Sequence, residues 1–137
     1  MKPAGPNSTS GNFTLSPSGP PISRIALYAR DMEGLSSFYQ KHFEFVRQDG
    51  SSADKIILAS PSGGCSLVIL QASKGHRVGQ STVKIVFDVE DVAAFKETQA
   101  CHGLEFGTIH HGPGYQFANA RDPAKNLIQI SNSYLAE

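Results

Sequence analysis

The sequence predicts an α+β fold made of two copies of a β-α-β-β-β unit, and two observations favour it. First, the chain resembles itself at an offset of sixty residues, with residues 24–31 matching 84–91 and residues 66–70 matching 126–130. Second, each copy has the same order of strand-like, helix-like and turn-like segments. Such self-similarity indicates two copies of one supersecondary unit, with a site where the copies meet.

The first copy begins with a strand over residues 22–29, which alternate in polarity and are rich in β-branched side chains. Asp31 is expected to cap a helix whose large apolar residues recur at helical spacing as far as about His42. Glycine- and serine-rich turns then separate three further strands. These strands are expected at residues 44–48, 54–59 and 65–71.

The second copy repeats this order after a connecting loop. A strand is expected at residues 83–89, and a helix begins at Asp91 and ends near Gly103. The remaining strands are expected at residues 104–110, 115–120 and 126–131.

Residues 1–20 are expected to form a flexible tail, because they are rich in Pro, Gly, Ser and Asn and hold few large apolar groups. A single domain is expected over residues 21–135. Within it, module one covers 21–72, a linker 73–81 and module two 82–135.

Composition narrows the range of partners. The chain has 137 residues, of which 12 are basic and 12 acidic, so its net charge is zero and neither nucleic acid nor an anionic membrane is expected as partner. No apolar run reaches the ~20 residues of a transmembrane helix, and no secretory signal is expected, because no apolar segment follows Lys2. The two cysteines lie in no metal-binding spacing, which is typical of free thiols in a reducing compartment. A cytoplasmic protein is therefore expected.

Strand alternation predicts which side chains face each helix and which face away. In the first strands, Arg24, Ala26 and Tyr28, and likewise Lys84, Val86 and Asp88, are expected to face away from the helix. At the offset of sixty residues, the last strands are expected to place Leu67, Ile69, Leu127 and Gln129 on this same side, with Val68, Leu70, Ile128 and Ile130 against the helices. Two such sheets meeting would enclose a cleft.

Three segments together resemble the vicinal oxygen chelate superfamily, which includes glyoxalase I, bleomycin-resistance proteins, fosfomycin-resistance proteins and extradiol dioxygenases. They are residues 25–32 leading into Phe38-Tyr39, residues 85–92, and the Arg-Asp-Pro-x-x-Asn-Leu-Ile segment at 121–128. The last is the most specific, and the resemblance extends over about residues 22–131. The family usually has glycine at the position of Lys125, so a strained or altered turn is expected there.

The resemblance implies paired modules, a curved mixed sheet around a cleft, and usually a dimer. In the family's metalloenzymes, residues of the first and last strand of each module hold a divalent metal, and those positions here are Arg24, Ile69, Lys84 and Gln129. Arginine, isoleucine and protonated lysine offer a metal no lone pair, and one amide oxygen cannot hold a divalent ion against water. We therefore expect no metal or other cofactor, as in the bleomycin-binding branch of the superfamily.

Arg24 and Lys84 occupy equivalent positions, and two cations approaching each other in a cleft repel by ~1–4 kcal/mol. Two interpretations remain open: an anionic ligand held by both cations, or an internal ion pair with Asp88. Apolar and aromatic side chains would complete a small-molecule pocket. The candidates for it are Tyr28, Tyr115, Phe117, Phe106, Leu67 and Ile69.

The sequence therefore favours a homodimeric protein that binds a small, partly aromatic, anionic molecule in a metal-free cleft. Its expected ligand-binding residues are Arg24, Lys84, Gln129, Ile69, Tyr28, Asp88, Tyr115 and Phe117. One alternative is a glyoxalase-like lyase or extradiol dioxygenase with a displaced metal site. His110, His111, Glu105 or Asp88 would then supply the ligands. A third hypothesis is a structural or regulatory fold whose cleft is filled by side chains.

Overall fold

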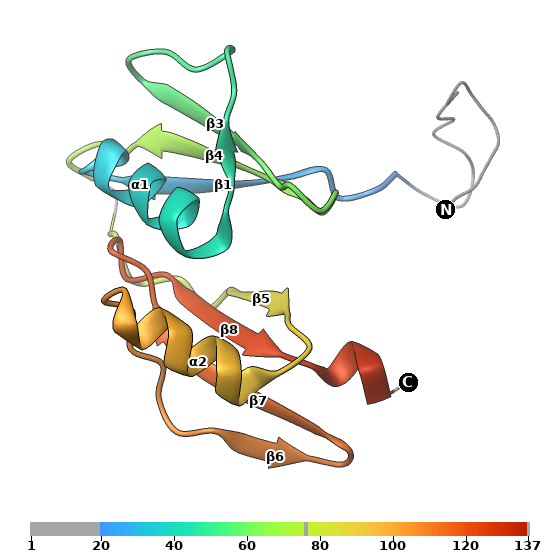
Figure 1. Ribbon diagram of the computed structural model, residues 1–137. Helices are drawn as coiled ribbons and strands as arrows, with labels where there is room; N and C mark the ends of the chain where they lie inside the picture. Colours follow the sequence, from blue (N-terminus) through green and yellow to red (C-terminus); the bar gives the residue numbers. More distant parts are fainter. Residues whose placement is uncertain (1–19, 76, 137) are drawn as a thin grey trace, which may run out of the picture.

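The computed structural model describes residues 20–75 and 77–136, so the tail expected over residues 1–20 lies almost entirely outside the described part. Figure 1 shows two modules, one above the other, each with its helix lying across one face of its own sheet. Each sheet has four strands and mixes parallel with antiparallel pairing, which confirms the predicted fold class. None of the helices in the described ranges has the length and apolar character needed to cross a membrane.

Module one has the strand order β1-β4-β3-β2, with β1 parallel to β4 and the other neighbours antiparallel. Asp31 caps α1 as predicted, because its carboxylate accepts a hydrogen bond of 2.9 Å from the Gly34 N–H. The elements are β1 (Arg24–Ala29), α1 (Met32–Phe43), β2 (Val46–Arg47), β3 (Lys55–Ala59) and β4 (Ser66–Gln71).

Module two has the equivalent order β5-β8-β7-β6, and Asp91 caps its helix through the Ala94 N–H at 3.0 Å. Its elements are β5 (Lys84–Asp88), α2 (Val92–Cys101), β6 (His110–Gly112), β7 (Tyr115–Arg121), β8 (Leu127–Ser131) and a short 3-10 helix, η2 (Ser133–Ala136).

The strand predicted over residues 104–110 is largely wrong, because β6 begins only at His110. Leu104 and Phe106 are buried, and their alternation with polar residues reflects packing into the core rather than pairing along a ladder. One backbone hydrogen bond, from the Gly107 N–H to the Asn119 carbonyl at 2.8 Å, connects this segment to β7.

The register of β4 differs from the prediction. Leu67 pairs with Ile25, and Ile69 pairs with Leu27, in a parallel ladder whose partners point to the same side of the sheet. Leu67 and Ile69 therefore face α1, with exposures of 2% and 0%, and the prediction that they face away from the helix is wrong. Val68 takes the position on the other face.

In module two the prediction for the last strand is confirmed. Ile128 pairs with Ile85 and Ile130 with Phe87, so both isoleucines face the helix and Gln129 faces away. Leu67 thus corresponds to Ile128, an offset of 61, although the first strands and helices correspond at an offset of 60. Module two therefore has one residue more than module one between the paired positions of its first and last strands. Its last turn is nevertheless one residue shorter, because Ala120 pairs with Ile128 whereas Leu58 pairs with Leu67, so the additional residues of module two lie before β7.

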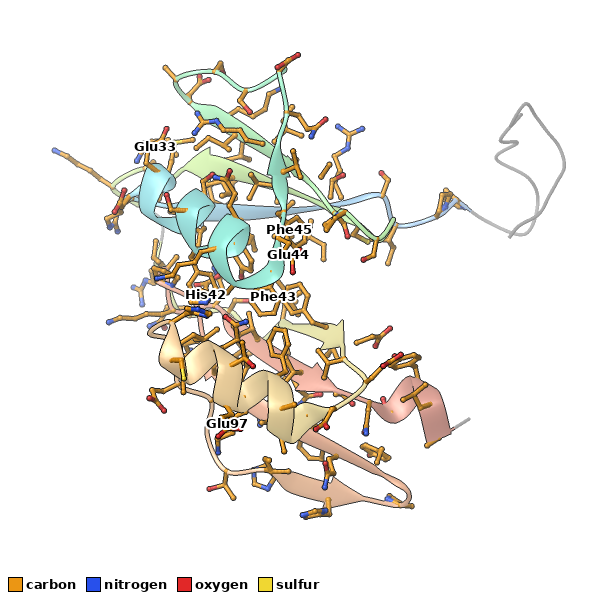
Figure 2. The ribbon with its side chains drawn as sticks, viewed as in Figure 1. Glu33, His42, Phe43, Glu44, Phe45 and Glu97 are labelled. Carbon is orange, nitrogen blue, oxygen red and sulfur yellow. The ribbon has the colours of Figure 1, made fainter. Side chains whose placement is uncertain are left out.

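The two modules meet through the end of α1, which is where Figure 2 shows His42 and Phe43 directed at module two. The Phe43 ring stacks on Phe87 of β5, with ring centroids 3.9 Å apart and planes 19° apart, and also lies near Phe95 of α2. Buried residues of both modules form one continuous hydrophobic cluster.

Two polar contacts cross the same interface. The Tyr39 hydroxyl donates a 2.6 Å hydrogen bond to the Asp122 carboxylate, and His42 Nδ1 lies 2.6 Å from Gln99 Oε1. Tyr39 and Gln99 occupy equivalent helix positions, so each helix extends one polar side chain to the other module. Burial, and then the neighbouring Asp122 carboxylate, raise the pKa of Tyr39 above its ordinary value near 10.

Asp122, which is 3% exposed, stabilises the turn between β7 and β8, here called the Asp-Pro turn. Besides Tyr39, its carboxylate accepts hydrogen bonds from the backbone N–H groups of Ala124 and Asn126 and from the Asn126 side chain. Lys125 has a left-handed backbone with φ of 68°, which confirms the strained turn that the sequence predicted.

Candidate functional site

The faces of the two sheets that point away from the helices, here called the outer faces, carry most of the predicted site residues. In module two, strand pairing places Lys84 and Asp88 of β5, Gln129 of β8, and Tyr115 and Phe117 of β7 on one outer face. In module one, Arg24 and Tyr28 of β1 lie on the other outer face.

Where β5, β8 and β7 lie side by side, the outer face of module two has three rows of paired residues, and Tyr115 lies beyond them, opposite Gly112 of β6. One end row is basic and contains Lys84, Leu127 and Arg121. The central row contains Val86, Gln129 and Asn119. The other end row contains Asp88, Ser131, Phe117 and His110.

The central row holds an oriented amide. Gln129 Nε2 donates a 2.9 Å hydrogen bond to Asn119 Oδ1, and both side chains are half-buried. This bond leaves the Gln129 carbonyl oxygen available to accept from a bound molecule. Asn119 was not predicted as a site residue, although its alternation with buried Ala118 and its expected pairing opposite Gln129 could have indicated it.

The aromatic end of the same face is already stacked. The His110 ring lies 5.1 Å from the Phe117 ring, with planes 28° apart, and Tyr115 lies 6.1 Å from Phe117. The Tyr115 ring lies over Gly112, where a side chain on Gly112 would collide with it. His110 is a second residue that the sequence reasoning did not place in the ligand site.

Three predicted wall residues do not reach the outer faces, and one of them is Leu67, which faces α1 and is 2% exposed. Ile69 is fully buried on the helix side of its sheet, and Val68, paired with Ala26, holds the position expected for it. Phe106 is 5% exposed and packs against Phe95 in the core.

The ion pair between Lys84 and Asp88, one of the two interpretations that the sequence left open, is not formed. Over residues 20–75 and 77–136, the one salt bridge within 4 Å joins Arg47 of β2 to Glu33 of α1. Lys84 and Asp88 instead border a groove of about 440 Å³ between the modules, which is walled by aromatic residues that include Phe43, Phe45 and Phe87. Arg24 is not among the residues that line this groove.

The residues at the family's metal positions do not fit a divalent ion. With the register of β4 taken into account, those positions hold Arg24, Val68, Lys84 and Gln129, and only the amide can supply an oxygen ligand. For a displaced site, His110 and His111 point to opposite faces of β6. No group of three His, Cys, Asp or Glu residues within the described part of the chain could hold a metal ion.

Comparisons with known proteins agree with this fold. The profile of the family described as "Glyoxalase/Bleomycin resistance protein/Dioxygenase superfamily" matches residues 22–130. No curated protein matches the chain.

Solved structures with the same fold include both enzymes and binding proteins. A lactoylglutathione lyase from Agrobacterium tumefaciens is 19% identical, with a TM-score of 0.65 over 81% of this chain and 92% of its own. TnmS3, an antibiotic binding protein from Streptomyces sp. CB03234, is 18% identical, with a TM-score of 0.68 over 81% of this chain and 93% of its own. At such identities the likeness establishes the fold alone.

Proposed function

Because the chain belongs to the glyoxalase/bleomycin resistance protein/dioxygenase superfamily, we propose that it binds a small, partly aromatic, anionic molecule in a metal-free cleft. The observation that carries this proposal is the row structure of the outer face of module two. It offers cations at Lys84 and Arg121, an oriented amide at Gln129, and stacked rings at Phe117 and His110.

The rows suggest how the ligand lies. Its carboxylate or similar group would face the basic row, the Gln129 carbonyl oxygen would accept a hydrogen bond from its centre, and its ring would stack near Phe117. A largely apolar surface with a few directional polar groups is the usual design of a small-molecule site. The antibiotic-binding neighbour with the same fold is consistent with this use of the cleft.

The cleft is proposed to be completed by a second copy of the chain. Within one chain the modules meet through Phe43 and Phe87 on their helix sides, so each outer face stays open, with Tyr28 43% and Val86 50% exposed. Edge strands β1 and β5 also have no partner on their outward side among the described strands. A homodimer would place Arg24, Tyr28 and Val68 of one copy over Lys84 and Gln129 of the other.

Isothermal calorimetry against a panel of aromatic carboxylates and thiol conjugates tests the ligand class. We expect at least one member to bind, and Gln129→Ala, Arg24→Ala and Lys84→Ala each to weaken it by about tenfold, the effect of losing one hydrogen bond to a charged or polar group. Lys41→Ala, which removes a cation exposed on α1, is the matched control and should leave the affinity unchanged. Failure of all three outer-face variants to weaken any ligand would overturn the proposal.

Mixing two variants tests the second copy. A dimer formed from Arg24→Ala and Lys84→Ala chains contains one cleft with both substitutions and one with neither. When the two variants are mixed in equal amounts and their chains exchange between dimers, about a quarter of all clefts should regain wild-type affinity. Each variant alone forms no cleft of wild-type affinity. Unchanged binding after exchange, verified with a tagged copy, would contradict a cleft shared between chains.

A further inference from the structure

Away from both outer faces, four basic side chains line one open hollow of about 640 Å³, here called the basic hollow. Arg30 follows β1, Lys74 and Arg77 belong to the linker, and Lys125 belongs to the Asp-Pro turn of module two. These residues are distant in sequence, and the fold gathers them where the linker passes the turn. No Asp or Glu lines the hollow within the described ranges.

The two acidic residues adjacent in sequence to this cluster are committed elsewhere. The Asp31 carboxylate caps α1 through the Gly34 N–H, and the Asp122 carboxylate is buried beneath the turn. Asp122 accepts hydrogen bonds from Tyr39, Ala124 and Asn126, so it faces the core. In a chain with no net charge, the hollow is therefore a local concentration of positive charge.

Lys125 is held in the hollow at a conformational cost. Its φ of 68° lies in the left-handed region, which costs a residue with a Cβ roughly 1–2 kcal/mol relative to glycine. Gly79 of the linker lies directly against this lysine: a Cβ on Gly79 would come within 3.0 Å of the Lys125 Cβ and 3.5 Å of its Cδ. The Lys125 stem thus runs along the linker backbone, which directs it beside the other cations.

The turn is stiffened from the other side by Arg121. Its guanidinium donates a 2.7 Å hydrogen bond to the Lys125 carbonyl, and the Lys125 N–H donates at 2.7 Å to the Asp122 carbonyl. Lys125 is therefore held by backbone bonds on both sides. Residues that their surroundings hold in a strained backbone conformation are found preferentially at ligand-binding sites.

From the converging cations, the absent carboxylates and the strained lysine, we propose that the basic hollow is a second binding site, for the phosphate groups of a small phosphorylated molecule. Several cations around one open hollow match a polyphosphate chain better than a single carboxylate, because each phosphoryl oxygen can accept a charge-assisted hydrogen bond.

Calorimetry with inorganic tripolyphosphate as the probe tests this site on the full chain. We expect binding that weakens as the salt concentration rises, and Arg77→Gln and Lys125→Gly each to weaken it by about tenfold or more. Lys41→Gln removes an equal charge outside the hollow and should leave the affinity unchanged. Because Lys125→Gly relaxes the left-handed turn, this variant should fold at least as stably as the wild type, which urea unfolding will verify.

Three outcomes would overturn the site. They are no measurable binding of tripolyphosphate, an equal loss in Lys41→Gln and Lys125→Gly, or tighter binding of a single-stranded RNA oligonucleotide than of tripolyphosphate. Arg24→Ala separates this site from the proposed cleft: it should weaken the aromatic acid and leave tripolyphosphate binding intact.

Discussion

The two modules have the same strand order, yet their last strands, β4 and β8, are shifted by one residue relative to each other. A shift of one residue sends every side chain of a strand to the opposite face. In β8 the shift leaves Gln129 on the outer face; in β4 it buries Ile69 and leaves Val68 there. Module two thus presents a polar centre and module one an apolar one, which suits a cleft in which one wall orients the ligand and the other covers it.

The largest effect is expected from glutamine substitutions at the neighbouring residues Ile69 and Val68 of β4, which point to opposite faces of the sheet. Ile69→Gln puts an amide into the core and should cost about 4 kcal/mol or more, because it combines lost packing with an unsatisfied polar group. Val68→Gln imitates Gln129 on the outer face and should cost about 1–2 kcal/mol. Urea unfolding curves measure both, and equal costs would show that the register of β4 is not as described.

The second-largest expected difference in stability is between substitutions in the turns that precede β4 and β8. Asp122→Ala removes a buried carboxylate and leaves Tyr39 and Asn126 without their acceptor, so we expect a loss of about 3 kcal/mol. The β3–β4 turn has an exposed Ser62 near the equivalent position, and Ser62→Ala should change stability by less than about 0.5 kcal/mol. The difference between the two, measured by thermal unfolding, would disappear if Asp122 were merely a turn residue.

The polar contacts made by Tyr39 and Gln99 differ in their response to pH. The folded protein keeps Tyr39 protonated, whereas the unfolded chain releases that proton near pH 10, so above pH 10 the unfolded state binds fewer protons and stability falls as pH rises. Tyr39→Phe should cost about 1–2 kcal/mol at neutral pH and remove this part of the alkaline decline. Gln99→Ala should leave the alkaline decline intact, since an amide does not titrate. Unfolding free energies at pH 8 to 11 make the comparison, and a parallel decline in all three proteins would refute it.

The smallest expected effect concerns the left-handed residues of the two turns. Gly63 has φ of 88° and open space around its Cα, so Gly63→Ala should destabilise by about 1 kcal/mol through backbone strain alone. Lys125→Gly should act in the opposite direction by a similar amount. Chemical unfolding measures both variants, and changes of the same sign would mean that packing against Gly79 outweighs the strain at Lys125.

The sequence predicted the helices, their aspartate caps and the repeat because each depends on local chemistry: helical spacing, a carboxylate before the first turn, and glycine in the turns. The direction of the β4 side chains was not predictable in this way. Residues 67–70 are all apolar, and even Val68 on the outer face is only 8% exposed. An uninterrupted apolar run has no alternation of polarity from which the face of each side chain can be assigned. The match at sixty residues therefore reflected shared apolar character rather than equivalent positions.

The candidate site was predictable on one sheet more than on the other. Lys84, Asp88, Tyr115, Phe117 and Gln129 do share an outer face, because β5 and β8 alternate in polarity and β7 pairs with β8. The basic hollow, by contrast, joins residues from β1, the linker and a turn. Such a cluster depends on how the linker passes the second module, which no local pattern of the sequence contains.

The paired contacts of Tyr39 with Asp122 and of His42 with Gln99 also bear on motion. Both bonds and the Phe43–Phe87 stack join the two modules, so hinging or sliding of one module against the other would have to break them. Each chain should therefore move as one rigid body on the timescale of ligand entry. If the proposed dimer forms the cleft, the opening that admits a ligand lies between copies, so its rate should respond to substitutions along β1 and β5 and not to substitutions between the modules.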